Sequence, residues 1–358
     1  MSTPPTQLPP PLKGRGASAN PPNRFEQIAL ERDADWNPEE DPAPRTVFLH
    51  DASQTIINYN DSPDIGFDAS INPYRGCEHG CAYCYARPFH EYLGFSPGLD
   101  FETKIMVKTD APELLRKELS SPKWKPQVIA MSGVTDCYQP AERRFKITRR
   151  CLEVLAEFRN PVGIVTKNFL VTRDLDVLRE LAKHNAAVVF ISVTTLDAAL
   201  TPKLEPRASL PAMRLRAIEQ LSAAGIPVGV FVAPVIPAIT DEEIPAILAA
   251  AYEAGARTAG YVLLRLPFAV KDIFADWLAH HFPDRKEKVL NRIRAMREGR
   301  LNNPEFGERM RGQGIFADQI RQLFEVAARK AGFREDDTPK LSTASFRRPG
   351  GTQLKLFA

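Results

Sequence analysis

The sequence has few cysteines and no long apolar run. Its 358 residues include five cysteines, and an odd, low number argues against a secreted protein held together by disulfides. No uninterrupted apolar run reaches about 18 residues, and no basic, apolar and small-residue pattern opens the chain. We therefore expect a cytoplasmic protein with no membrane span, no membrane partner and no signal peptide.

The sequence also lacks a strong excess of charge of either sign. Lys and Arg number 47 against 44 for Asp and Glu, a net charge of +3. This balance does not by itself indicate a nucleic-acid partner, although a local basic groove is compatible with it. The apolar fraction of 44% and the charged fraction of 25% are those of a soluble globular protein.

Both ends of the chain lack periodic apolar residues. Proline-rich stretches fill the beginning, and Asp-Asp-Thr-Pro and Arg-Arg-Pro-Gly-Gly interrupt the end. We predict a disordered Pro-rich leader over 1–45, a core domain over 46–270, a basic helical extension over 271–335 and a flexible tail over 336–358. Within the tail, residues 354–357 are a candidate terminal anchor.

Between these ends, short β-branched apolar runs alternate with segments of helical period. Each run is short enough to be a strand buried on both faces. Helical periodicity covers 147–158, 174–184, 211–224 and 241–254, and Gly225 and Gly255 are placed to end the last two helices. The predicted strands are 67–71, 128–132, 162–166, 187–192, 228–232 and 260–264.

Strands that alternate with helices imply right-handed crossovers and a parallel sheet. Six such units are fewer than the eight of a closed TIM barrel. The expected fold class is therefore α/β, an open partial (β/α)6 TIM-like barrel behind a disordered leader. A doubly wound sheet is the competing architecture, but no Gly-x-Gly-x-x-Gly motif follows any predicted strand.

Three of the five cysteines lie within eight residues, in Cys77-Glu-His-Gly-Cys81-Ala-Tyr-Cys84. Three thiolates in one loop directly after a predicted strand favour a metal centre over inert thiols. A closed zinc site needs a fourth ligand, for which His79 and Cys137 are the candidates. A [4Fe–4S] cluster held by three cysteines instead leaves one iron open to an exogenous ligand.

The spacing of these cysteines, with Tyr83 before the last one, resembles the signature of the radical S-adenosylmethionine superfamily. The resemblance implies a [4Fe–4S] cluster bound by Cys77, Cys81 and Cys84 and S-adenosylmethionine chelated at the free iron. It also implies reductive cleavage of S-adenosylmethionine to a 5′-deoxyadenosyl radical, which abstracts hydrogen from a substrate that the sequence does not identify. A flavodoxin- or ferredoxin-like one-electron reductant is the implied partner.

The string Cys-x-Tyr-Cys-Tyr, completed by Tyr85, is similar to the spore photoproduct lyase branch of this superfamily, also called DNA repair photolyase-like. The similarity spans roughly residues 65–270. Polar residues at predicted strand ends, where a barrel places its active site, match positions that contact S-adenosylmethionine in that branch. Hydroxyl and carboxylate groups can satisfy the cofactor's ammonium, and a lysine can pair with its carboxylate or ribose oxygens. The cofactor-binding candidates are Tyr83, Ser132, Asp136, Lys167 and Ser192.

These candidates have structural alternatives. Ser132 and Asp136 could cap a strand end, and Ser192 could bond only its own backbone. Lys167 directly follows a buried strand, where a charge is costly without a partner, although a surface lysine is the alternative.

Two further residues are catalytic candidates. In the lyase, the tyrosine at the position of Tyr85 takes part in a hydrogen-atom relay. The lyase also has a cysteine where this chain has Met131, and this departure argues against repair of a DNA lesion. Cys137 is a candidate replacement as hydrogen donor, with a plain buried thiol as the alternative. Cys151 shares an apolar helix face and is expected in the core.

The segment 274–314 is rich in arginine and lysine. A solvated helix face is the simplest interpretation, and a phosphate-contacting surface is the alternative. The second interpretation would favour a radical enzyme that repairs or modifies RNA or DNA. A third class of function is a zinc-stabilised binding protein without activity. The arginines concerned are Arg292, Arg294, Arg297, Arg300, Arg309 and Arg311.

Overall fold

The computed structural model describes residues 12–26, 44–334 and 337–349. Its centre is a seven-stranded sheet in the order β10-β9-β8-β7-β6-β3-β2. Six of these strands pair in parallel, while β2 is antiparallel to β3. The strands are β2 (Ile57–Tyr59), β3 (Ala69–Ile71), β6 (Ile129–Met131), β7 (Val162–Thr166), β8 (Ala187–Ser192), β9 (Val228–Val235) and β10 (Thr258–Leu263).

The strand order confirms the partial barrel. Each of the six parallel strands pairs with the next one along the chain, whereas a doubly wound sheet reverses its order at a switch point. The sheet ends at β10 on one side and at β2 on the other, so the barrel remains open between these edges. All six predicted strands are present, with ends that differ from the prediction by at most three residues.

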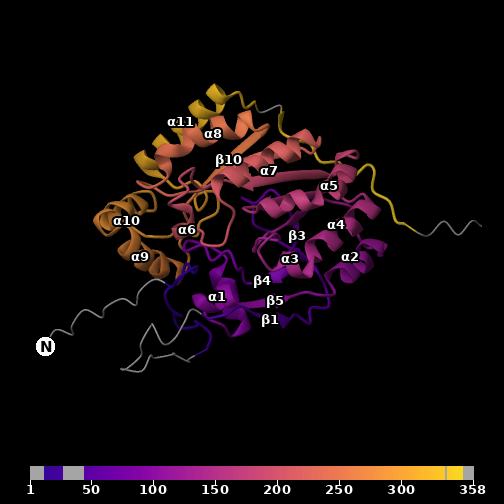
Figure 1. The fold of residues 1–358 in the computed structure, drawn as a ribbon, viewed down its shortest axis with the longest axis horizontal. Coiled ribbons are helices and arrows are strands. Elements are labelled where there is room, and N and C mark those ends of the chain that lie inside the picture. Colours follow the sequence, from indigo (N-terminus) through magenta and orange to yellow (C-terminus); the bar gives the residue numbers. More distant parts are fainter. Residues whose placement is uncertain (1–11, 27–43, 335–336, 350–358) are drawn as a thin grey trace, which may run out of the picture.

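Amphipathic helices cover the outside of the sheet. Figure 1 shows them following one another around it. Cys151 lies in this core and has no exposed surface, as expected. Gly225 and Gly255 adopt the left-handed backbone that ends a helix. The helices are α2 (Ala111–Ser120), α3 (Glu142–Phe145), α4 (Ile147–Phe158), α5 (Leu175–Ala182), α6 (Thr201–Leu204), α7 (Pro211–Ala223) and α8 (Ile244–Glu253).

A second, three-stranded sheet was not predicted from the sequence. Its order is β1-β5-β4, with β1 (Val47–His50) parallel and β4 (Tyr74–Arg75) antiparallel to β5 (Lys104–Val107). Its strands are two to four residues long, which is too short to give a periodic signal. The short helix α1 (Leu99–Thr103) precedes β5, and β4 leads directly into the cysteine loop. This sheet therefore anchors both sides of the candidate site.

The C-terminal extension forms part of the wall around the cysteines. Its helices are α9 (Val270–His281), α10 (Lys286–Ala295) and α11 (Gly314–Ala331). Side chains of α9 and α10 form a second apolar cluster together with Cys81 and Tyr83 of the cysteine loop. Helix α11 packs instead against α8. The extension thus closes one end of the site.

Residues 12–26 differ from the expectation of a disordered leader. Backbone N–H groups of Gly16 and Ala17 donate to the Glu102 carboxylate at 3.1 and 2.9 Å. Asn20 bonds Asp100 at 3.0 Å. This segment therefore follows a defined path over the cysteine loop, because the core offers carboxylates to its backbone and side chains. Residues 1–11 and 27–43 of the predicted leader lie outside the described residues.

Residues 337–349 of the predicted flexible tail also contact the core. The Arg347 N–H donates to the Phe158 carbonyl at 2.9 Å, and the rings of Phe346 and Phe158 are 6.3 Å apart. The candidate anchor at 354–357 lies outside the described residues.

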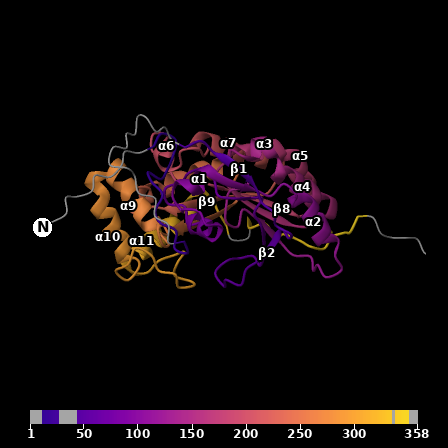
Figure 2. The same ribbon diagram turned by 90° about the horizontal axis from the view of Figure 1, so that it is seen from below.

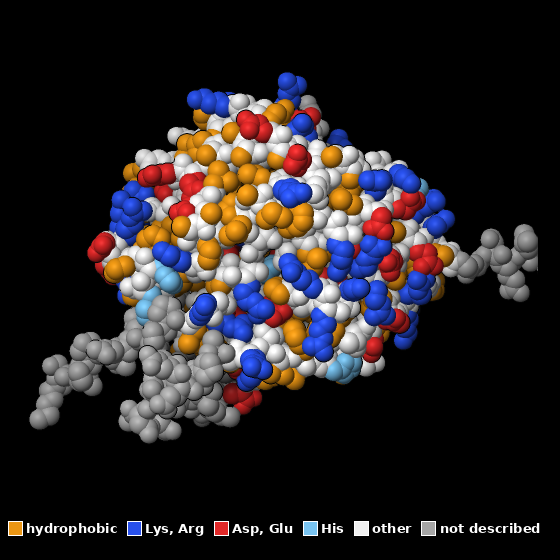
Figure 3. Space-filling view, in the orientation of Figure 1, with side chains coloured by type: hydrophobic (Ala, Val, Ile, Leu, Met, Phe, Trp, Pro, Cys, Tyr) orange, Lys and Arg blue, Asp and Glu red, His pale blue; other side chains and the backbone are white. Residues whose placement is uncertain are grey.

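Charges on the visible face are mixed. Figure 3 shows Lys and Arg interspersed with Asp and Glu, without one continuous basic surface on that face. Within the described ranges, no helix has the length and apolar character needed to cross a membrane.

Candidate active site

The three cysteines lie in the loop between β4 and the 3-10 helix η1 (Arg87–Leu93). The Cys77 N–H donates to the Phe101 carbonyl at 2.9 Å, which ties the loop to α1. Gly76 has a φ of 79°, and a Cβ there would lie 2.9 Å from the same carbonyl, so the turn needs glycine. All three thiols are free, and those of Cys77 and Cys81 are buried. The loop is thus held by backbone contacts, which leaves its sulfur atoms available.

The donor set fits a cluster with three protein ligands. Burial raises the pKa of all three thiols, and Asp136, Cys84 and Cys81 raise that of Cys77 further. The thiols therefore lie in a poorly hydrated environment, in which a thiolate is unfavourable until a cationic centre compensates its charge. Three free cysteines and an open fourth position are what a [4Fe–4S] cluster that binds an exogenous ligand requires.

Neither candidate fourth ligand of a closed zinc site points to the cysteines. The Nε2 atom of His79 lies 3.1 Å from the amide of Asn168, and its Nδ1 lies 3.5 Å from Asp136. Cys137 is fully buried in the main core. No three His, Cys, Asp or Glu side chains among the described residues are grouped to hold one metal ion. In a [4Fe–4S] cluster each cysteine binds a different iron, so the sulfur atoms lie farther apart than around a single ion.

A buried arginine supports the loop from behind. Arg87 donates from Nε and Nη2 to the Cys81 carbonyl at 3.0 and 2.8 Å and pairs with Glu102 at 2.6 Å. Both side chains of this ion pair are fully buried. Burial raises the pKa of Cys84, and the Arg87 charge partly offsets this rise. Arg87 therefore fixes the loop and contributes a positive charge next to it.

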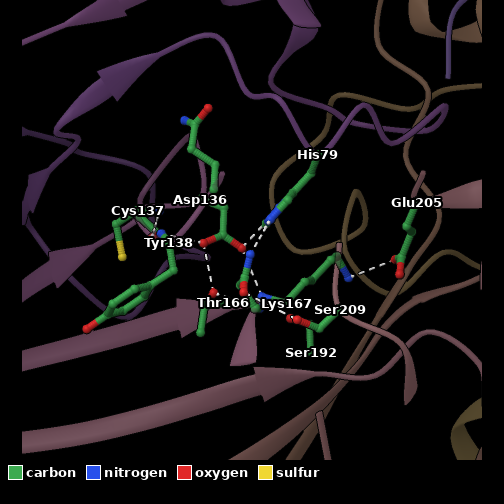
Figure 4. A network of polar contacts seen from close by, with 12 residues as sticks. His79, Asp136, Cys137, Tyr138, Thr166, Lys167, Ser192, Glu205 and Ser209 are labelled. Carbon is green, nitrogen blue, oxygen red and sulfur yellow. Dashed lines mark hydrogen bonds and ion pairs between the residues drawn. The ribbon is translucent and has the colours of Figure 1, made fainter. Parts of the chain in front are cut away.

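A second buried network lies at the ends of β7 and β8 and is centred on Glu205, whose ion pair with Lys167 is drawn in Figure 4. Its carboxylate accepts hydrogen bonds from Tyr83, from Arg214 and, at 2.7 Å, from Thr194. The Nζ atom of Lys167 lies 3.2 Å from it. Burial opposes the charge of Glu205, but Arg214 and Lys167 hold its pKa well below the usual range. The network thus presents one carboxylate balanced by two cations.

Lys167 has the partner that its position after a buried strand requires. Besides Glu205, its ammonium donates to Thr194 at 3.1 Å and to the Ala233 carbonyl at 2.8 Å. Ser192, at the end of β8, is buried, and its carbonyl accepts a bond from Arg214 at 3.0 Å. Three of the five predicted cofactor-binding residues, Tyr83, Lys167 and Ser192, are therefore joined through one network.

Asp136 joins the ends of β6 and β7 (Figure 4). Its carboxylate accepts bonds of 2.8 Å from the Thr166 hydroxyl and from the backbone N–H groups of Lys167 and Tyr138. With His79 also nearby, protein donors surround both oxygens. This geometry gives Asp136 the structural role of a strand-end cap. A contact with a cofactor stays a prediction.

Ser132 ends β6 in a left-handed conformation, with a φ of 76°. Its hydroxyl oxygen accepts a bond from the Cys137 N–H at 2.9 Å, and its own N–H donates to Ile71 at 3.2 Å. Ser132 thus caps the strand end, and its predicted cofactor contact is not tested by these bonds.

The two catalytic candidates occupy different places. Tyr85 is 41% exposed, and its hydroxyl donates to the Gly133 carbonyl at 3.1 Å beside the end of β6. Cys137 has no exposed surface, and burial raises its pKa well above the usual value. Met131, which precedes Ser132, is also fully buried in the main core. The structure therefore keeps Tyr85 near the cysteine loop and places Cys137 among apolar core residues.

Several residues of the site carry no sequence signal of their own. Glu205 and Arg214 lie outside the cysteine motif, and charged residues are normally expected on the surface. Arg87 and Glu102 were missed for the same reason. Tertiary packing alone turns Arg87 and Glu102 into a buried ion pair. The one hint in the sequence was Lys167, a cation after a buried strand that requires an anionic partner.

Comparison with known proteins agrees with this geometry. The sequence model of the Radical SAM superfamily matches residues 71–251. An uncharacterized protein of Mycobacterium tuberculosis is 37% identical over 248 residues, 68% of this chain and 72% of the relative. An uncharacterized protein of Methanocaldococcus jannaschii is 31% identical over 173 residues, 48% of this chain and 62% of the relative.

Among solved structures, a spore photoproduct lyase variant has a TM-score of 0.58 at 15% identity and covers 80% of this chain and 79% of its own. Another variant, with AdoMet and a dinucleoside spore photoproduct bound, has a TM-score of 0.55 at 17% identity and covers 80% and 78%. At these identities the likeness is one of fold. The family match spans half of the sequence and includes all three cysteines, and the chain therefore belongs to the radical S-adenosylmethionine superfamily of enzymes.

Proposed function

We propose that this enzyme holds a [4Fe–4S] cluster on Cys77, Cys81 and Cys84 and binds S-adenosylmethionine beside it. The bound cofactors would supply one-electron cleavage of S-adenosylmethionine to methionine and a 5′-deoxyadenosyl radical that abstracts hydrogen from a substrate. The observation that carries the proposal is the set of three free cysteines in one loop beside the strand-end polar network. An external one-electron donor of the flavodoxin or ferredoxin type completes it.

The strand-end residues would orient S-adenosylmethionine. Lys167 is 16% exposed, so its ammonium can meet a carboxylate or ribose oxygen while Glu205 balances its charge. Tyr83, within the cysteine loop, is 7% exposed and is fixed by its hydrogen bond to Glu205. Ser132 and Ser192 would form hydrogen bonds with the cofactor. Asp136 would belong to the same site because its carboxylate accepts a hydrogen bond from the Lys167 backbone N–H.

Apolar side chains would keep water from the radical. Cys81 and Tyr83 pack in one cluster with Leu264, Phe274 and Trp277, and water exclusion protects reactive intermediates. Tyr85 is the proposed hydrogen-atom relay, because it adjoins Cys84 and remains half-exposed at the open side of the barrel. Cys137 is a weaker candidate for this role because it is buried in the main core.

A second candidate function acts on nucleic acid with the same chemistry. It is supported by the fold shared with spore photoproduct lyase, one structure of which holds a dinucleoside lesion. Met131 in place of the lyase cysteine argues for a modification or repair reaction that differs from the lyase's own. Salt-sensitive binding of a polynucleotide would favour this candidate.

The test is anaerobic reconstitution with iron and sulfide, followed by dithionite and S-adenosylmethionine. We expect a brown wild-type protein with about four irons per chain that releases 5′-deoxyadenosine. Cys81→Ala should lose both properties, while Cys151→Ala, which removes a core thiol, should keep them. A colourless protein that retains tightly bound zinc, or a Cys81→Ala variant as active as the wild type, would overturn the proposal.

A further inference from the structure

Two segments that are far apart in the sequence meet at the open side of the barrel. The loop between β2 and β3 contributes Asp64, and the segment after α10 contributes Arg309, whose Nε lies 2.7 Å from that carboxylate. The same segment is fixed to the end of β10 by a bond of 2.9 Å from the Leu263 N–H to the Met310 carbonyl. Figure 2 shows the β2 region and this segment on the same side of the molecule. Together they line the gap between the two edges of the sheet.

Two arginines at this opening have buried donors without partners. Arg297 is 1% exposed, and its Nη2 donates to the carbonyls of Leu264 at 2.7 Å and Arg309 at 3.1 Å. Its Nη1 is buried and has no hydrogen-bond partner among the described residues. The Nε of Arg265 is likewise buried and unpartnered, and its guanidinium lies 5.4 Å from the centre of the Tyr85 ring.

The local charge balance leaves a positive excess. Arg265, Arg297 and Arg309 meet one carboxylate, Asp64, which Arg309 already occupies. Burial lowers the pKa of both arginines, that of Arg297 to about 10. Arg309 lowers the pKa of Arg265 further, against the smaller opposite effects of Tyr85 and Asp64, and Arg265 lowers that of Arg297. A buried cation without a partner is costly, so such a pair is retained where an anion completes it.

Three other arginines of the C-terminal extension do not share this arrangement. Arg292 pairs with Asp241 at 3.2 Å, and Arg321 pairs with Asp318 at 2.8 Å. Arg300 is exposed to solvent. Arg265 thus carries its unpartnered donor beside the Tyr85 ring, and Arg297 is a neighbouring cation of Arg265.

We propose that Arg265 and Arg297 bind a phosphate group of the substrate at the open side of the barrel, next to Tyr85. Guanidinium groups match phosphate because several planar N–H donors meet several anionic oxygens, and two of them suit its charge. The inference rests on the proposed function only for the identity of the bound compound as the substrate. The phosphate belongs either to a polynucleotide backbone or to a small phosphorylated compound.

Anaerobic calorimetry on the reconstituted protein tests this site with uridine, uridine 5′-monophosphate and an oligouridylate of about ten nucleotides. We expect uridine 5′-monophosphate to bind at least about tenfold more tightly than uridine, and Arg265→Gln to remove about tenfold of that affinity. Arg265→Lys should restore part of it, and the exposed matched control Arg300→Gln should bind as the wild type does. Arg265 is preferred for substitution because its side chain makes few contacts, a 3.8 Å approach to Met310 among them.

Binding of either phosphate compound supports the site if Arg265→Gln weakens that binding. Tighter binding of the oligouridylate identifies a polynucleotide backbone, and equal binding identifies a small phosphorylated compound. A wild type that binds uridine as well as its monophosphate, or an Arg265→Gln variant with wild-type affinity, overturns the inference. Because binding is measured without turnover, a protein that binds phosphate through Arg265 but releases no 5′-deoxyadenosine would overturn the proposed function and leave this site standing.

Discussion

Replacing Glu205 with glutamine should destabilise the protein more than any exposed substitution, because buried Arg214 and partly buried Lys167 share its buried carboxylate. Arg214 is 1% exposed, and its Nε and Nη1 donate to the carbonyls of Ser209 and Ser192, which carry no compensating charge. Glutamine keeps the size of the side chain but removes its charge. Breaking a buried ion pair on one side costs about 3–5 kcal/mol, because the remaining charge stays buried without compensation.

Urea unfolding followed by circular dichroism measures this cost. Glu219→Gln, an exposed change on α7, the helix that carries Arg214, is the matched control and should stay within about 0.5 kcal/mol of the wild type. A double-mutant cycle with Arg214→Gln should show that the two losses are not additive, by about 0.5–3 kcal/mol. A Glu205→Gln loss below about 1 kcal/mol would refute the idea of a charged, desolvated pair.

The pH dependence gives a second check. Because the folded pKa of Glu205 lies below its usual value, its contribution to stability is complete above the unfolded pKa of about 4.5. That contribution is lost as the pH falls through the folded pKa. The wild type should therefore lose more unfolding free energy than Glu205→Gln on acidification below about pH 4.5. Parallel losses in the two proteins would contradict the assignment.

Two further predictions concern the surroundings of the cysteine loop. A Cβ on Gly16 would lie 1.7 Å from the Gly80 carbonyl oxygen. Gly16→Ala should therefore lower the free energy of unfolding by about 1–3 kcal/mol and speed iodoacetamide labelling of the cysteine loop. Gly66→Ala, with open space around it, is the control and should do neither. Equal labelling of the two variants would show that residues 12–26 do not cover the loop. Burial lowers the pKa of His90 to about 4, so stability present above pH 6.5 should fall by about 3 kcal/mol on acidification to pH 4. His90→Leu should lack this loss, and a variant that keeps it would place the titration elsewhere.

The sequence by itself determined the features that depend on neighbouring residues. The cysteine spacing predicted the metal-binding loop, because three ligands supplied by one loop lie only a few residues apart in the sequence. Periodicity predicted the six parallel strands and four principal helices, since burial on one or both faces leaves a regular pattern of apolar positions. The same pattern correctly placed Cys151 in the core.

Tertiary structure decided the features that join distant segments. Glu205 forms ion pairs with Lys167 and Arg214, and Arg309 forms one with Asp64 across the open barrel. Residues 12–26 donate backbone hydrogen bonds to Glu102. None of these pairings has a periodic or local signal, because a charged side chain looks the same in sequence whether water or a buried counter-ion solvates it. Packing alone decides which charges are desolvated, and so it selected the partners that support the cysteines and the arginines that remain unpaired beside Tyr85.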